Sequence, residues 1–200
     1  MKPRLLVAAL AFGLIGHLAT AQTPASHIRG SIDTLDGKIL TVTTRDGAKA
    51  SVILLDHARV IAFRKVDMSA ITAGTFIGTA AIPGADGQLV ALEVVVFNQA
   101  AHGSGAGHFD WDLAPGSSMT NGTIDAVVQG MAGRELTLSY MGGSVKVLVR
   151  PDVPVVTPIA ADKSDLKPGA PVFIAPTKTV NGSLSATFVA VGKDGVAPPL

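Results

Sequence analysis

The sequence contains an internal repeat that covers most of its length. GSIDTLDGKILTVTTRDG at residues 30–47 aligns with GTIDAVVQGMAGRELTLSYMGG at residues 122–143, through Gly-x-Ile-Asp, a glycine turn, Leu-Thr and a second glycine turn. Two more pairs of blocks follow in the same order, residues 66–78 with 161–173 and residues 86–94 with 181–189. From Gly37 onward the offset stays at 95 or 96 residues. Such regular self-similarity indicates that one structural unit has been duplicated.

The local pattern within each copy predicts β-strands. Apolar and polar residues alternate from Ile28, and the pairs Asp36-Gly37 and Asp46-Gly47 separate successive apolar runs, which is typical of hairpin turns. The stretch DMSAITAG at 67–74 predicts one turn of helix, with Asp67 or Ser69 as N-cap and Gly74 as its stop. About six short strands and one helical turn in roughly 70 residues are typical of a small barrel.

These signals predict an all-β fold of two tandem small OB-like β-barrels. The first barrel is expected at residues 27–98 and the second at 119–194, with a linker at 99–118 and a tail at 195–200. The apolar strand positions predict the core: Ile32, Leu40, Val42, Val52, Leu54, Val60, Ile71, Phe76, Ile77, Leu89 and Val94 in the first copy, and Ile124, Leu136, Leu138, Val147, Val149, Val156, Leu166, Val172, Leu184 and Val189 in the second.

The first 21 residues have the pattern of a cleaved signal peptide. Lys2 and Arg4 precede the apolar run LLVAALAFGLIG, and ATA at 19–21 predicts cleavage before Gln22. The run is short for an uncleaved membrane anchor, which is the competing interpretation. No later stretch is long and apolar enough for a membrane helix, so we expect a periplasmic or secreted protein.

Composition excludes several classes of function. The absence of cysteine excludes disulfides, thiol catalysis and Cys-ligated zinc. The 16 basic residues include Lys2 and Arg4 of the leader, so the mature chain carries 14 basic and 15 acidic residues. A nucleic-acid binder usually has a basic field. We therefore expect no nucleic-acid partner, although OB-like barrels often bind single strands.

The blocks GSIDTLDGKILTV, SAITAGTFIG and DGQLVALEV resemble an exported bacterial family classed as a domain of unknown function. The resemblance covers both copies and implies OB-like β-barrel repeats. The second copy departs from the family pattern at Pro171 and at Asn181-Gly182. Members are sometimes labelled metal-transporter permeases, but a permease needs several membrane helices. The resemblance implies no catalytic residues.

The segment AHGSGAGHFDWDL at 101–113 is the candidate metal site. His102, His108, Asp110 and Asp112 are all side chains that can ligate a metal, and a glycine-rich loop could fold them around one ion. Their spacing matches no standard zinc or calcium pattern. The favoured interpretation is a linker between the barrels, with Trp111 and Leu113 packed between them, and Trp111 is also the candidate ligand-binding residue.

Other constellations favour structural roles. Ser104, Ser117 and Ser118 lie near histidines in the sequence but not in a nucleophile elbow. Gly103, Gly105 and Gly107 match no phosphate-binding motif. The methionines at 68, 119, 131 and 141 are too scattered for a copper motif, and packing explains them better. Asp33 and Asp125 occupy equivalent positions, which predicts a structural role in both copies.

The sequence therefore predicts an exported, non-enzymatic binding or interaction module. Its partner is expected to be an envelope protein or a small-molecule ligand, and no cofactor is required. The alternative is a periplasmic metal-binding protein that uses the His/Asp linker with a divalent ion. A hydrolase is the least favoured hypothesis, because no catalytic constellation stands out.

Overall fold

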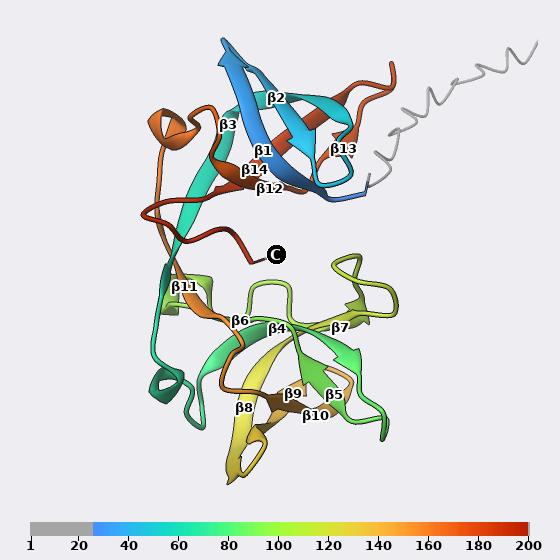
Figure 1. Cartoon of the computed structure of the whole chain (residues 1–200), viewed down its shortest axis with the longest axis vertical. Coiled ribbons are helices and arrows are strands. Elements are labelled where there is room, and N and C mark those ends of the chain that lie inside the picture. Colours follow the sequence, from blue (N-terminus) through green and yellow to red (C-terminus); the bar gives the residue numbers. More distant parts are fainter. Residues whose placement is uncertain (1–25, 200) are drawn as a thin grey trace, which may run out of the picture.

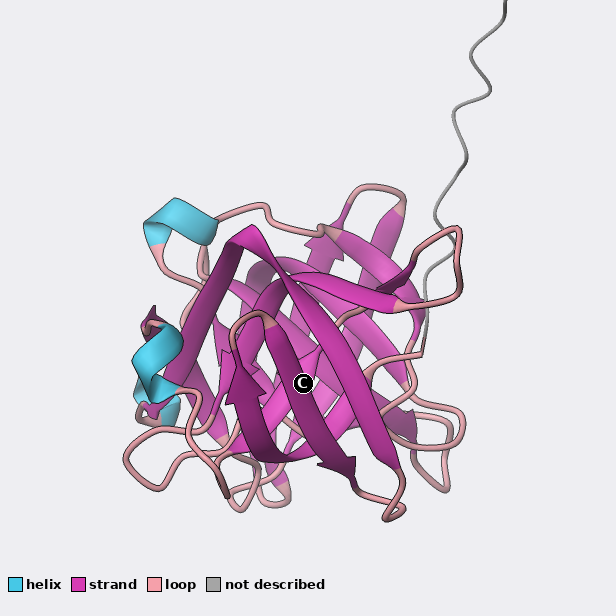
Figure 2. Cartoon of the chain, turned by 90° about the horizontal axis from the view of Figure 1, so that it is seen from above, coloured by secondary structure: helices cyan, strands magenta, loops and turns pink. Residues whose placement is uncertain are grey.

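The computed structural model describes residues 26–199, and the predicted signal peptide lies outside them. The described part is all-β: strands are joined by turns and by three short 3-10 helices, and it contains no α-helix (Figure 2). The predicted fold class is therefore confirmed at the level of an all-β protein. No helix in residues 26–199 combines the length and the apolar character needed to cross a membrane.

The strands gather in two units, one above the other in Figure 1. The first unit consists of β1 (Ile28–Asp36), β2 (Ile39–Thr44), the first part of β3 (Lys49–Lys65), β12 (Pro171–Ile174) and β14 (Leu184–Val191), with β13 (Thr177–Lys178) at its edge. The second unit consists of β4 (Phe76–Pro83), β5 (Leu89–Ala91), β8 (Ser118–Gly130), β9 (Gly133–Tyr140) and β10 (Gly143–Val149), with β7 (Gly107–Asp110) at its edge.

Each unit combines strands from both copies of the repeat. β1 pairs with β12, with Gly30 opposite Val172, and the equivalent pairing of β8 with β4 places Gly122 opposite Ile77. β14 lies parallel to β3 in the first unit, and β5 lies parallel to β10 in the second. The boundaries expected from the sequence, 27–98 and 119–194, are therefore corrected: these segments are the two copies, but neither builds a unit alone.

Two strands connect the units. β3 is 17 residues long, and its second half leaves the first unit to pair with β11 (Val155–Ala160), which runs antiparallel to it. β6 (Val94–Val96) then pairs with both β11 and β4. β3 is one continuous strand, but the equivalent part of the second copy is divided into β10 and β11. Pro151 and Pro154 lie between these two strands, and proline cannot donate a hydrogen bond to a strand ladder.

The duplicated motifs make the same contacts in both units. Asp33 lies at a register shift of β1 and accepts a hydrogen bond from the Thr43 hydroxyl at 2.8 Å. Asp125 lies at the equivalent shift of β8 and accepts one from the Ser139 hydroxyl at 2.9 Å. These bonds give both aspartates a structural role, as predicted, but across two strands rather than within a turn.

The repeated Gly-x-Ile-Asp motif requires glycine for a steric reason. A Cβ at Gly30 would lie 2.0 Å from the carbonyl oxygen of Thr43, and one at Gly122 would lie 2.5 Å from that of Ser139. No real Cβ tolerates such distances, so the close approach of neighbouring backbones requires glycine at both positions. The predicted hairpin turns are also present, with Gly37 and Gly47 at φ of 56° and 85°.

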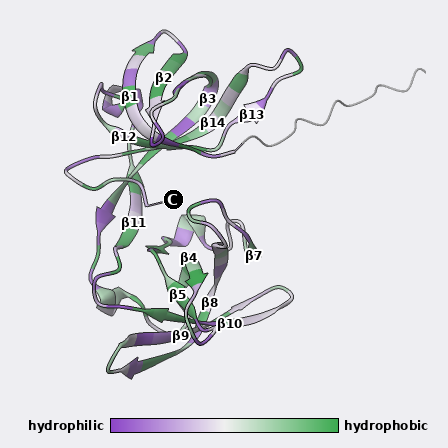
Figure 3. Ribbon diagram, turned by 45° about the vertical axis from the view of Figure 1, so that its right-hand side comes forward, coloured by the Kyte–Doolittle hydropathy of each residue, from purple (hydrophilic) through white to green (hydrophobic). Residues whose placement is uncertain are grey.

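Each unit has its own apolar core. The strands of both units carry green, hydrophobic stretches in Figure 3. The predicted core residues are buried, apart from Leu89 and Leu184, which are half-buried. These residues are grouped by unit and not by copy, because each unit combines strands from both copies. Leu166, Val172 and Val189 of the second copy pack with Leu40 of the first copy, and Ile77 packs with second-copy residues in the other unit.

The predicted helical turn is a 3-10 helix, η1 (Met68–Ala70), and Asp67 is its N-cap. The second copy has the equivalent η3 (Lys163–Asp165), where Asp162 and Asp165 form a capping box. A third helix, η2 (Gln99–Ala101), has no counterpart in the duplicated pattern. Each of η1 and η3 follows a connecting strand and turns the chain into the unit that it enters.

Candidate functional site

The segment that joins the copies is ordered into short elements. It begins with η2, whose N-cap Asn98 accepts a hydrogen bond from the Ala101 backbone N–H at 3.1 Å. It continues through exposed turns into β7, which pairs with β8. The expected linker at 99–118 is therefore corrected, because part of it is a strand of the second unit.

The four predicted metal ligands do not converge. His102 lies against the ring of Phe76, with centroids 5.0 Å apart. His108 Nδ1 lies 2.8 Å from the Thr120 hydroxyl, and its ring stacks on Tyr140. Asp110 pairs with Ser118 through the strand ladder, whereas Asp112 is held by His27 and Arg29. Residues 26–199 contain no group of three or more His, Asp or Glu side chains placed to hold a metal ion.

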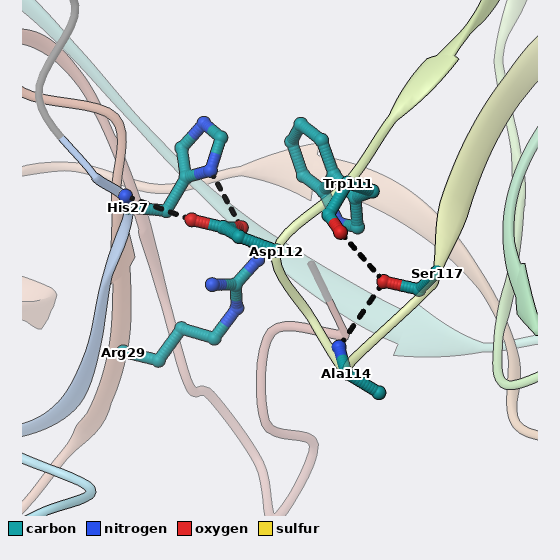
Figure 4. A network of polar contacts seen from close by, with 6 residues as sticks. All are labelled: His27, Arg29, Trp111, Asp112, Ala114 and Ser117. Atoms are coloured by element: carbon teal, nitrogen blue, oxygen red, sulfur yellow. Dashed lines mark hydrogen bonds and ion pairs between the residues drawn. The ribbon is translucent and has the colours of Figure 1, made fainter.

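The candidate serines have structural surroundings. Ser117 is buried, donates to the Trp111 carbonyl at 2.7 Å and accepts from the Ala114 N–H at 3.1 Å, so it closes the turn before β8 (Figure 4). Ser118 lies in β8. Across the described part of the chain, no hydrogen bond joins Ser104, Ser117 or Ser118 to a histidine ring.

Asp112 links the two units through a cluster that we call the Asp112 latch, formed by His27, Arg29, Trp111, Asp112 and Phe173. Figure 4 shows the first four of these residues. The Asp112 carboxylate accepts from the His27 backbone N–H at 3.1 Å and from Arg29 Nη2 at 2.8 Å. The Arg29 guanidinium lies 5.7 Å from the Trp111 ring centroid and 5.2 Å from that of Phe173. The start of β1 is thereby tied to the loop that precedes β8.

The electrostatics of the latch favour the charged form of Asp112. Partial burial raises the pKa of this carboxyl, but hydrogen bonds from Arg29 and His27 outweigh the burial and bring the pKa down to about 2. Arg29 is buried, whereas the Asp112 side chain is 41% exposed. The latch therefore supplies a buried cation with a carboxylate and two aromatic faces.

A third apolar cluster fills the space between the units. Its buried members are Phe63, Val95, Val156, Phe173 and Ala190, and Trp111 packs against them. Trp111 therefore packs between the units, although the indole Nε1 is buried without a hydrogen-bond partner among the described residues. The C-terminal segment also runs between the units (Figure 1), and Val196 joins this cluster.

A cavity of about 620 Å³ opens beside this cluster, and we call it the junction cavity. Residues of β3, β6, β11, β14 and η2 contribute to its wall, so both copies are needed to form it. The wall is mainly apolar and includes Ile61, Phe63, Val95, Phe97, Ile159 and Phe188. Its volume and lining are those of a small-molecule site.

Each polar side chain in the lining of the junction cavity can donate a hydrogen bond. Among the described residues, Arg59 is the one charged residue in the wall, and its guanidinium lies 5.9 Å from the Phe188 ring centroid. Asn98 and Ser104 supply an amide and a hydroxyl at the side formed by the joining segment. The Asn98 side-chain oxygen caps η2, and its amide N–H groups have no hydrogen-bond partner among residues 26–199.

Glu93 is a buried carboxyl between β5 and β6. Its side chain is 3% exposed, and Oε1 has no hydrogen-bond partner within residues 26–199. Burial raises the pKa of Glu93 to about 8, although Arg29 and Arg45 oppose this shift. Glu93 therefore favours the protonated, uncharged form near neutral pH.

Sequence reasoning missed Arg29, Arg59, Glu93 and Phe188. One signal was available in the repeat itself, because the blocks LVALEV and LSATFV place Glu93 opposite Phe188. The same offset of 95 residues places Arg59 opposite Pro154. Duplication explains the residues that the copies share, so positions where the copies differ are the ones free to serve a function of the whole chain.

In comparisons with protein-family models, curated proteins and solved structures, nothing matched this chain.

Proposed function

We propose that this chain is an exported, non-enzymatic binding protein whose ligand site is the junction cavity. The observation that carries the proposal is the cavity itself: a largely apolar space of about 620 Å³ with a few polar side chains in its wall. Clefts of this size and composition are the usual sites for small ligands. The signal-peptide pattern of residues 1–21 supports a periplasmic or secreted location.

The proposal includes two OB-like β-barrels as the scaffold. The pairing order supports this, because each unit has five strands in the succession of an OB-fold, with one parallel pair, β3 with β14 or β10 with β5. In this arrangement residues of both copies line the junction cavity, so the ligand site belongs to neither barrel alone.

Binding of an uncharged apolar fluorophore tests this function. We expect N-phenyl-1-naphthylamine, whose fluorescence rises in apolar surroundings, to bind saturably to the mature chain. Ala160→Trp fills the junction cavity from β11 and should abolish the signal, because the exposed Ala160 lines the cavity. Ala132→Trp is the matched control, since Ala132 is exposed in the turn between β8 and β9. Absence of saturable binding, or equal binding by both variants, would refute the proposal.

A further inference from the structure

We infer that the ligand of the junction cavity is an amphipathic anion, an apolar chain or ring system that bears one anionic head group. This inference rests on the proposed binding function and names the class of ligand. Its basis is the distribution of charge and polarity along the cavity wall. An apolar body would lie along Ile61, Phe97 and Phe188, and the head group would reach Arg59.

The cavity complements an anion and not a cation. Arg59 supplies a positive charge to the lining, and none of the described aspartates or glutamates lines the cavity. Among residues 26–199, Arg59 has no ion-pair partner, and its contact is with the face of Phe188. A guanidinium that is already positioned over an aromatic ring can bind a carboxylate through two parallel hydrogen bonds.

The polar groups near Arg59 also favour an anionic head group. The Ser104 hydroxyl makes no side-chain hydrogen bond within the described part of the chain, and Asn98 offers its amide N–H groups. Together with Arg59 these side chains present donors from β3 and from the segment around η2. Such a set satisfies the acceptor oxygens of an anionic head group, whereas it offers a cationic head group no carboxylate.

Comparison of the two copies supports a role for Arg59 in binding and not in stabilising the fold. Its equivalent in the second copy is Pro154, and the equivalent of Phe188 is Glu93. The equivalent place in the other half of the molecule, where the backbone N–H of Val94 bonds the carbonyl of Pro154, is therefore built without an arginine or a phenylalanine. Arg59 is also exposed and lies outside both unit cores, so the fold does not require a guanidinium beside the apolar cavity.

Three compounds with the same ten-carbon chain test the charge preference: decanoate, decanol and decyltrimethylammonium, titrated calorimetrically below their micelle-forming concentrations. We expect decanoate to bind at least about tenfold more tightly than decanol, as one charge-assisted contact allows, and the ammonium compound to bind most weakly. Arg59→Gln should remove the advantage of decanoate over decanol, and Arg59→Lys should restore part of it. Arg64→Gln is the matched control, because Arg64 is exposed on the same strand and does not line the cavity.

The outcomes separate this inference from the function on which it rests. Equal binding of decanoate and decanol, preference for the ammonium compound, or unchanged decanoate binding in Arg59→Gln would overturn the anion preference and leave the binding function intact. The same holds if the naphthylamine fluorophore binds and no decyl compound does. If neither the fluorophore nor any decyl compound binds, the proposed function fails, and the inference fails with it.

Discussion

Arg29 of the first strand and Asp112 of the joining segment form an ion pair across the two units, with Nη2 and Oδ1 2.8 Å apart. These residues are 83 positions apart in the sequence. Because Arg29 is buried, its charge depends on this partner and on the faces of Trp111 and Phe173. The contact makes Asp112 a determinant of how the units are held together.

Asp112→Asn should lower the free energy of unfolding by about 1 to 3 kcal/mol, because a buried guanidinium loses its charged acceptor. Urea unfolding followed by circular dichroism measures this change. Asp110→Asn is the control and should stay within about 0.5 kcal/mol of the wild type, since Asp110 is exposed on β7. Equal effects of the two substitutions would contradict the role of the latch.

The contribution of Asp112 should also depend on pH in a defined direction. Its pKa in the folded chain is about 2, below the ordinary value of 3.8. The stabilisation is therefore present above the ordinary pKa and is lost as the pH falls through the folded value. The difference in stability between wild type and Asp112→Asn should narrow as urea titrations move from pH 4 towards pH 2. A constant difference over this range would contradict the assignment.

Glu93 should produce the opposite pH dependence. Its folded pKa is about 8 and its ordinary value is 4.5, so the folded chain retains a proton that the unfolded chain releases. This contribution to stability is complete below the ordinary pKa and disappears as the pH rises through the folded pKa. Urea titrations from pH 5 to pH 9 should show a loss of stability that Glu93→Gln removes. Glu135→Gln, which weakens the exposed pair with Lys146, should retain the wild-type slope.

Neither Gly30 nor Gly122 should tolerate the added methyl group of alanine, because the neighbouring backbone lies too close at both positions. Gly30→Ala and Gly122→Ala should each lower the free energy of unfolding by about 2 kcal/mol or more, since the new Cβ would overlap a carbonyl oxygen. Gly130→Ala is the control, because its Cβ would meet its nearest neighbour at an ordinary 3.4 Å. A tolerated Gly122→Ala would show that the equivalent contacts differ between the units.

Because each unit combines strands from both copies, cutting the chain between the copies should not separate the two fragments. A protease site inserted among the exposed residues 103–106 should be cut without separating the fragments, because each unit contains strands from both. Size-exclusion chromatography of the cut protein should give one peak with the retention of the uncut insertion variant. Separation of the fragments under native conditions would contradict the exchanged pairing.

The sequence predicted the strands and the buried residues because both depend on local alternation and on turn residues. Leu40, Val52 and Leu136 are buried as their patterns require. It did not predict that strands of the two copies combine in each unit. The alternating pattern around Val172 predicts that one face of this strand is buried, but not which copy packs against it. What decides the partner is the length of β3, whose 17 residues span about 55 Å at ~3.3 Å per residue and therefore carry the chain into the second unit.

The candidate site was less predictable for the same reason. Trp111 was expected to pack between the units, and it does. The junction cavity arises only where β3, β11 and β14 meet, so no single segment contains its pattern. Arg59 and Phe188 are 129 positions apart in the printed sequence and become neighbours through the parallel pairing of β3 with β14.

The exchanged pairing also bears on how such a chain could have originated. A chain with a single repeat would leave its first three strands without their closing partners, and a second identical chain could supply them through the same pairings. The present molecule is then equivalent to an intertwined homodimer whose subunits have been fused. In such a fusion each half can change independently, whereas a symmetric homodimer could not place Arg59 and Phe188 on one side and Pro154 and Glu93 on the other.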